Sequence, residues 1–98
     1  MTTRPACRIG DADIPHCSGM VRAQGVESVL VNGRPWSCLG HLNTPHLLPG
    51  DPCPVHSAPI AVASTSVFVG GRAAGRIGDK IGGCTAVAQG SLNVFAGG

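Results

Sequence analysis

The chain has 98 residues and a formal net charge of +2, with 15 glycines, 8 prolines, 5 cysteines and no tyrosine. The length suits one domain, and the small charge, which includes no basic run, excludes a nucleic-acid or membrane surface that depends on electrostatics. The N-terminus lacks the basic and apolar regions of a signal peptide, and no segment approaches the ~20 apolar residues of a membrane span, so we expect synthesis and folding in the cytoplasm.

Short strands are the only regular elements that the sequence predicts. In chain order they are Ser28–Val31, Ile60–Val62, Val67–Val69 and Asn93–Phe95. Each is rich in β-branched or aromatic residues, and glycines lie close by. Asn32-Gly33 is a strong signal for a type I′ hairpin turn, and Gly70-Gly71 is its counterpart further along the chain. No segment keeps an apolar period of 3.6 residues, so we expect a mostly-β fold.

One unit occurs three times in the chain. The copies begin at Arg4, Arg34 and Arg72 and read RPACRIGDADIPH, RPWSCLGHLNTPH and RAAGRIGDKIGGC. Each ends in an apolar run closed by glycine: SVLVNG, SVFVGG and NVFAGG. The repeats therefore span approximately residues 4–33, 34–71 and 72–98. Such repeats fix the architecture, and three of them could close around a common pseudo-threefold axis.

Each repeat also places a metal-type ligand at the same offset. The residue five positions after Asp11, His41 and Asp79 is His16, His46 and Cys84, respectively. The second repeat carries an insertion, LLPGDPCPVH, which supplies a fourth candidate ligand, His56. The three imidazoles and the thiolate of Cys84 together form the closed, four-coordinate set that structural zinc favours, and the cysteine favours zinc over iron. One zinc ion would strengthen a small domain whose core is thin.

The residues before the ligand differ between the repeats. The first and third repeats have Arg8-x-x-Asp11 and Arg76-x-x-Asp79, whereas the second has Cys38-x-x-His41. Because both charged residues are replaced together, we expect the arginine and aspartate to pair, within or between repeats. His41 is then a structural residue or a group that supports the metal ligands. In a reducing compartment the cysteines are thiols or ligands, and we expect Cys7, Cys17 and Cys38 to be packing residues.

These repeats resemble the PAAR-repeat family. The motif positions are Pro5-Ala6-Cys7-Arg8, with degenerate copies Pro35-Trp36-Ser37-Cys38 and Ala73-Ala74-Gly75-Arg76, and no copy spells the motif in full. The resemblance implies a small, pointed, β-rich cone of three pseudo-symmetric repeats with one metal, usually zinc, near its apex.

It also implies a non-enzymatic, membrane-piercing tip. One monomer would cap the blunt end of a trimeric β-helical spike of a contractile injection machine, in a phage tail or a bacterial type VI secretion system. The tip would contact the target cell envelope transiently and would bind no nucleic acid. Without an extension at either end, the chain resembles a bare tip. We expect the turns at Asn32-Gly33 and Gly70-Gly71 to lie towards the base, opposite the metal loops.

Two other functions can be weighed against the spike tip. Cys38-x-x-His41 and Cys53-x-x-His56 have a spacing like that of a zinc finger, which would make the protein a small binding adaptor. This alternative leaves the repeats unexplained and lacks a basic, base-reading helix. An enzyme is disfavoured because Glu27 is the only glutamate and no H-E-x-x-H motif occurs.

Overall fold

The computed structural model describes residues 3–15, 19–47 and 55–98. Within these ranges the chain forms short strands and no helix, which confirms the mostly-β prediction. The strands are β1 (Arg4–Pro5), β2 (Val26–Val31), β3 (Arg34–Trp36), β4 (His46–Leu47), β5 (Val55–His56), β6 (Phe68–Val69), β7 (Arg72–Ala73) and β8 (Phe95–Ala96). They pair as four antiparallel two-stranded sheets: β1–β8, β2–β3, β4–β5 and β6–β7.

The two predicted hairpin turns are present. Asn32 and Gly33 join β2 to β3 with φ angles of 53° and 81°, and Gly70 and Gly71 join β6 to β7 with 57° and 82°. Positive φ at both central residues is the signature of a type I′ turn. The β1–β8 sheet is the equivalent of these two hairpins but has no turn, because it pairs β8 at the end of the chain with β1 at its start. The last strand thus closes the ring of repeats.

One predicted strand is wrong. Ile60–Val62 forms no strand, and only Ile60 makes an isolated bridge, to Ile81. The backbone N–H groups of Ala61 and Val62 both donate to the same carbonyl oxygen, that of Lys80. This pair of bonds interrupts the regular ladder, as in a β-bulge, and the local chain path overrides the high β propensity of this run.

Backbone hydrogen bonds link the three repeats in a cycle. The N–H of Cys7 donates to the Gly75 carbonyl (3.2 Å), that of Gly75 to Ser37 (3.2 Å), and that of Ser37 back to Cys7 (2.9 Å). These three residues occupy the same position in the three repeats, so their bonds form a closed triangle about the axis.

Two further sets of bridges repeat this cyclic pattern. One consists of Arg8–Trp36, Cys38–Ala74 and Arg76–Ala6, and the other of Asp13–Val87, Arg22–Asn43 and Ile60–Ile81. Within each set every bridge joins one repeat to the next. The molecule is therefore a stack of threefold layers, held mainly by contacts between repeats rather than within them.

The apolar core is thin and divided into two clusters. The first contains Ala6, Val31, Trp36, Cys38, Val69, Ala74 and Ala96, and the second contains Cys7, Ala58, Ile60, Ala63, Ala73, Ile81 and Val87. Trp36 and its equivalents Ala6 and Ala74 lie in the first cluster, so one large and two small side chains share the space at the axis. The indole N–H of Trp36 donates to the Gly75 carbonyl (2.9 Å), which satisfies its buried polar group.

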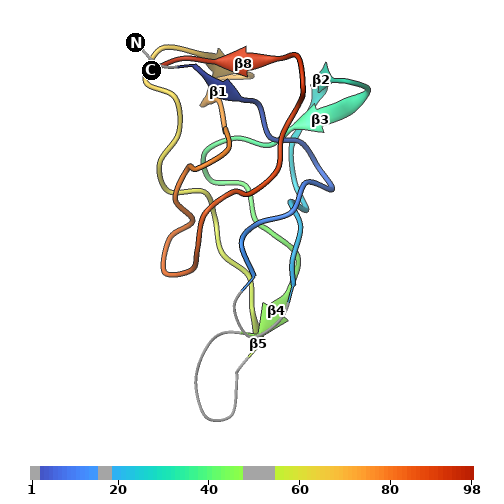
Figure 1. Ribbon diagram of the computed structural model, residues 1–98, viewed down its shortest axis with the longest axis vertical. Coiled ribbons are helices and arrows are strands. Elements are labelled where there is room, and N and C mark those ends of the chain that lie inside the picture. The colour runs from blue at the N-terminus through green and yellow to red at the C-terminus, as the bar shows by residue number, and fades with distance from the viewer. Residues whose placement is uncertain (1–2, 16–18, 48–54) are drawn as a thin grey trace.

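The molecule is elongated, with dimensions of 39 × 26 × 23 Å. Sheets β1–β8, β2–β3 and β6–β7 lie at one end with both termini, and β4–β5 lies near the opposite, narrower end (Figure 1). The hairpin turns are thus far from β4 and β5, as predicted. In the described part of the chain no helix is long and apolar enough to cross a membrane.

Candidate metal centre

Three predicted ligands come together beside β4 and β5. His46 and His56 are direct partners in the register of this sheet, with ring centroids 4.3 Å apart. Cys84, from the third repeat, approaches His46, with 3.2 Å between Nε2 and Sγ. One potential ligand atom from each of the three residues lies within 4.8 Å of the others. The second and third repeats therefore meet through metal-type side chains.

A tight turn presents Cys84. The N–H of Cys84 donates to the Ile81 carbonyl (3.0 Å), and the N–H of Ile81 donates to the Thr85 carbonyl (2.8 Å). Gly83 has a φ of 64°, a conformation that residues with a Cβ rarely adopt. Burial raises the pKa of the Cys84 thiol, and a hydrogen bond from Asn43 acts in the opposite direction. A metal ion would provide the positive charge that a thiolate needs at this half-buried position.

The donor set fits a zinc ion. Nδ1 of His46 lies 2.8 Å from the Thr44 carbonyl, which can only accept, so Nδ1 carries the proton and Nε2 offers a lone pair. Zinc-bound histidines commonly donate their second ring N–H to a backbone carbonyl in this way. Tetrahedral zinc would separate a nitrogen and a sulfur ligand by about 3.5 Å, close to the distance between His46 and Cys84.

The remaining candidate ligands are placed as follows. His16, Cys17 and Cys53 lie outside the described residues. Among the residues that are described, Cys38 and His41 belong to no potential metal group, whereas His56 lies with His46 and Cys84. The described residues of the finger-like set, Cys38, His41 and His56, therefore do not form one group. Cys7 and Cys38 are fully buried thiols in the core, as expected of packing residues.

The sequence analysis missed a buried polar network next to this group. Arg22 and Asp13 form an ion pair (2.8 Å) whose side chains are both 0% exposed. The Asn43 amide donates to the same Asp13 oxygen (3.1 Å), and Nη1 of Arg22 donates to the His41 carbonyl (3.1 Å). Burial raises the pKa of Asp13, and the contacts with Arg22 and Asn43 oppose that rise. The network is costly to bury, so its members depend on one another.

Asn43 connects this network to all three ligand segments. It lies three residues before His46, its Oδ1 accepts from the N–H of Ala58 (2.9 Å), and its Nδ2 lies 3.9 Å from Sγ of Cys84. Ala58 is two residues after His56. The Asn43 amide thus fixes the positions of the chain segments that carry the candidate ligands.

An alignment of the three repeats with one another could have indicated this buried network. AQG occurs at 23–25 and at 88–90, so Arg22 aligns with Val87, which is buried. Asp13 aligns in the same way with Asn43 and Ile81, which are also buried. An arginine or aspartate at a position that is apolar in another repeat indicates a buried charge that requires a partner.

The predicted arginine–aspartate pairs form in the first and third repeats. Arg8 contacts Asp11 (2.9 Å) and Arg76 contacts Asp79 (2.8 Å). Each aspartate also accepts from the first arginine of the next repeat in the cycle. These contacts are Arg34–Asp11 (3.0 Å) and Arg4–Asp79 (2.9 Å). The pairs therefore act both within and between repeats.

In the second repeat His41 takes the place of the aspartate. Its Nδ1 accepts from the N–H of Cys38 (2.9 Å), as the Asp11 carboxylate accepts from the N–H of Arg8 (2.8 Å). The imidazole preserves the turn but not the negative charge. His41 therefore has a structural role, one of the two predicted for it.

A comparison with known protein families identifies the family of these repeats. Residues 10–89 match the family model described as PAAR motif, which covers most of the chain. No curated protein matches the sequence.

Proposed function

Because the chain belongs to the PAAR-motif family, we propose that it is the tip of a spike in a contractile injection machine. The motif points to spike-tip proteins of such machines in general. In this proposal one monomer caps the blunt end of a trimeric β-helical spike, in a phage tail or a type VI secretion system. The wide end faces the spike and the narrow end leads into the target envelope. The tip acts mechanically and catalyses no reaction.

Three exposed apolar side chains carry this proposal. Leu30, Phe68 and Phe95 occupy equivalent positions on β2, β6 and β8 and are 58%, 63% and 51% exposed. Their strands lie together at the wide end (Figure 1). Large apolar residues exposed at equivalent positions indicate an interaction site, and their threefold repetition suits a partner made of three identical subunits. Such a cap would also cover the open strand edges of the spike.

The metal group supports the same role. We propose that His46, His56 and Cys84, together with His16, hold one zinc ion near the narrow end. The ligands would then come from all three repeats, so that the ion joins the chain where few residues are available to pack a core. Four protein ligands would leave no open position for catalysis, which agrees with a structural site. Zinc bound in this way would contribute directly to the free energy of folding.

Metal analysis tests the site. We expect about one zinc ion per purified chain, as typical of a single structural site, and loss of zinc in Cys84→Ser and His46→Gln. Cys38→Ala is the control, because it should retain zinc at the tip site but lose it from the finger-like set. Zinc retained in both ligand variants would refute this assignment. Zinc lost only from the control would move it to the middle repeat.

Binding to the spike is tested separately. A variant with Leu30, Phe68 and Phe95 all changed to aspartate should fold, because these side chains are exposed, but should no longer bind a trimeric β-helical spike protein encoded in the same genome. Ile14→Asp is the control, since Ile14 is 49% exposed but lies on the ligand-bearing loop of the first repeat. The mass of the wild-type complex should correspond to one tip per trimer. Undiminished binding of the triple variant would exclude this surface.

A further inference from the structure

Two equivalent clefts lie between neighbouring repeats. The first, of about 390 Å³, is lined by Gln24, Gly25, Gly40, His41 and Arg72 among others. The second, of about 410 Å³, is lined by the equivalent residues Gln89, Gly90, Gly10, Asp11 and Arg34. Since the backbone is alike in both, differences in chemistry between the clefts reflect their side chains. The second cleft therefore serves as an internal reference for the first.

In the reference cleft both arginines pair with a carboxylate. The Asp11 carboxylate accepts from the guanidinium of Arg34 (3.0 Å) and from that of Arg8 (2.9 Å). One carboxylate thus satisfies donors from two repeats. In this geometry each arginine has an anionic partner within the protein.

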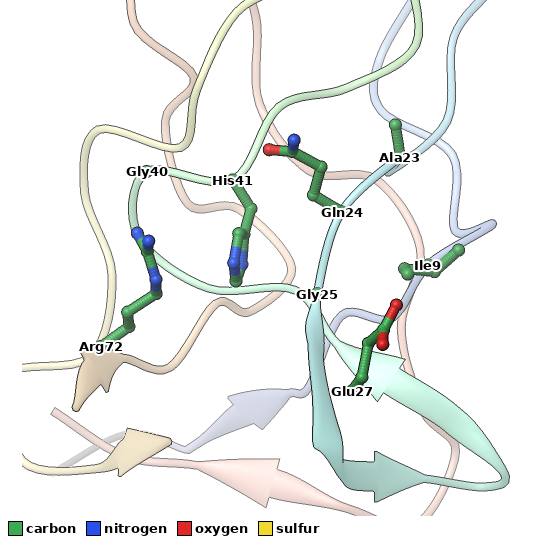
Figure 2. A pocket seen from close by; sticks show the side chains of 8 residues that line it. All are labelled: Ile9, Ala23, Gln24, Gly25, Glu27, Gly40, His41 and Arg72. Atoms are coloured by element: carbon green, nitrogen blue, oxygen red, sulfur yellow. The ribbon is translucent and has the colours of Figure 1, made fainter. Parts of the chain in front are cut away.

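The first cleft lacks that carboxylate. Arg72, the equivalent of Arg34, donates from Nη1 to the Leu39 carbonyl (3.0 Å). It forms no ion pair with any residue in ranges 3–15, 19–47 and 55–98. Glu27 also lines this cleft, but Figure 2 shows it well apart from Arg72, with His41 between them in this view. The guanidinium therefore faces the cleft without a carboxylate partner.

His41 contributes a second donor to the same cleft. Because its Nδ1 accepts from the Cys38 N–H, the neutral ring carries its proton on Nε2. No described residue accepts a hydrogen bond from Nε2, although the side chain is about nine-tenths buried. Burial, and then the nearby charges of Arg72 and Arg22, lower the pKa of His41, so the ring is neutral near pH 7. Two N–H donor groups thus line one cleft in which no described carboxylate pairs with them.

We propose that the cleft between His41 and Arg72 binds a small oxyanion, a carboxylate or a phosphate, which takes the part that Asp11 plays in the reference cleft. The planar guanidinium suits the two oxygens of either group, and the imidazole N–H adds a directed bond. The site is on the side of the molecule and does not involve the metal group or the exposed apolar residues of the wide end. The inference therefore stands or falls independently of the spike-tip function.

Anion titration followed by NMR tests the site. Sodium phosphate and sodium acetate are added separately to the wild-type protein at pH 7.5 and constant ionic strength. We expect saturable shifts of the backbone amides of residues 38–41 and of the His41 ring, with a dissociation constant in the millimolar range. Saturation by both anions indicates a site for oxyanions in general. Saturation by only one identifies the preferred ligand as phosphate or carboxylate. Linear, unsaturated shifts with both would overturn the proposal.

Three variants provide the controls. Arg72→Gln should weaken binding by roughly tenfold or more, the loss expected for one charge-assisted hydrogen bond. His41→Asp should abolish binding, because it places a carboxylate inside the protein next to Arg72. Arg34→Gln, in the reference cleft, should leave the affinity at residues 38–41 unchanged. Equal binding by wild type and Arg72→Gln would show that the anion is held elsewhere.

Discussion

Replacing Asp13 with asparagine should destabilise the protein severely. The change keeps the shape of the side chain but removes the charge that balances Arg22, which is completely buried. The guanidinium would retain only the His41 carbonyl and a neutral amide as partners. Removing one member of a buried ion pair typically costs about 3–5 kcal/mol, because the other charge is left without compensation. Small domains are stable by only about 5–15 kcal/mol in total.

Urea and thermal unfolding measure this loss, with metal present and after chelation. A cost of 3 kcal/mol in a domain of this size lowers Tm by at least about 12 °C. The control is the double variant Asp13→Leu/Arg22→Met, which removes both charges. The third repeat holds apolar Ile81 and Val87 at the equivalent positions, so this variant should be more stable than Asp13→Asn. A cost below about 1 kcal/mol for Asp13→Asn, or a double variant no more stable than it, would refute this reasoning.

Two further predictions concern the thiols and the buried amide. Burial raises the pKa of Cys38 to about 11, and that of Cys7 even more. The neutral thiols therefore contribute stability that is complete below about pH 9 and is lost as pH rises, since the unfolded chain ionises first. The urea midpoint should fall between about pH 9 and pH 11, the interval between the ordinary thiol pKa and the raised pKa of Cys38. Cys7→Ala/Cys38→Ala should reduce that fall; a midpoint independent of pH would contradict this. Asn43→Ala should lower zinc affinity by about 10–100-fold in chelator competition and alter the thiolate-to-metal band of the cobalt form. Unchanged affinity and spectrum would show that the amide does not position the ligands.

The turns and the grouping of three candidate ligands were predictable because their signals are local and periodic. Asn32-Gly33 needs only its own two residues to specify a hairpin turn. His46 and Cys84 share an offset within repeats that fold alike, so a common sequence position implies a common place in space. His56 required one further idea, that an insertion in one repeat extends towards the same end. These inferences needed no knowledge of long-range packing.

The buried network was not predictable in the same way. The Ala12–Val21 bridge brings Asp13 and Arg22 together within the first repeat, and the Arg22–Asn43 bridge adds Asn43 from the second repeat. No two of these three residues share a local motif. Their positions in the other repeats are partly apolar, so a search for repeated ligands passes over them. The failed strand at Ile60–Val62 has a related cause. Its propensity is intrinsic, whereas its hydrogen bonds are set by Lys80 in another repeat.

The substitution at His41 shows how one repeat can diverge without breaking the ring. The turn needs an acceptor for the N–H of residue 38, and an imidazole nitrogen provides one as well as a carboxylate does. Charge, in contrast, is not needed for the turn. Without the carboxylate, Arg72 has no ion pair among the described residues, so a residue that preserves the turn gives this cleft a different chemistry.

The triangle of Cys7, Ser37 and Gly75 makes the sharpest prediction about the threefold closure. A Cβ at Gly75 would overlap the Ser37 carbonyl oxygen and lie 2.8 Å from Sγ of Cys7, and both neighbours are fixed by the ring of backbone hydrogen bonds. Gly75→Ala should therefore cost about 3 kcal/mol, at the upper end for overpacking. Gly82→Ala is the matched control, because its Cβ would make an ordinary 3.5 Å contact with Ala61 and should be neutral or slightly stabilising. Equal urea midpoints for the two variants would mean that the axis is not closed by this triangle.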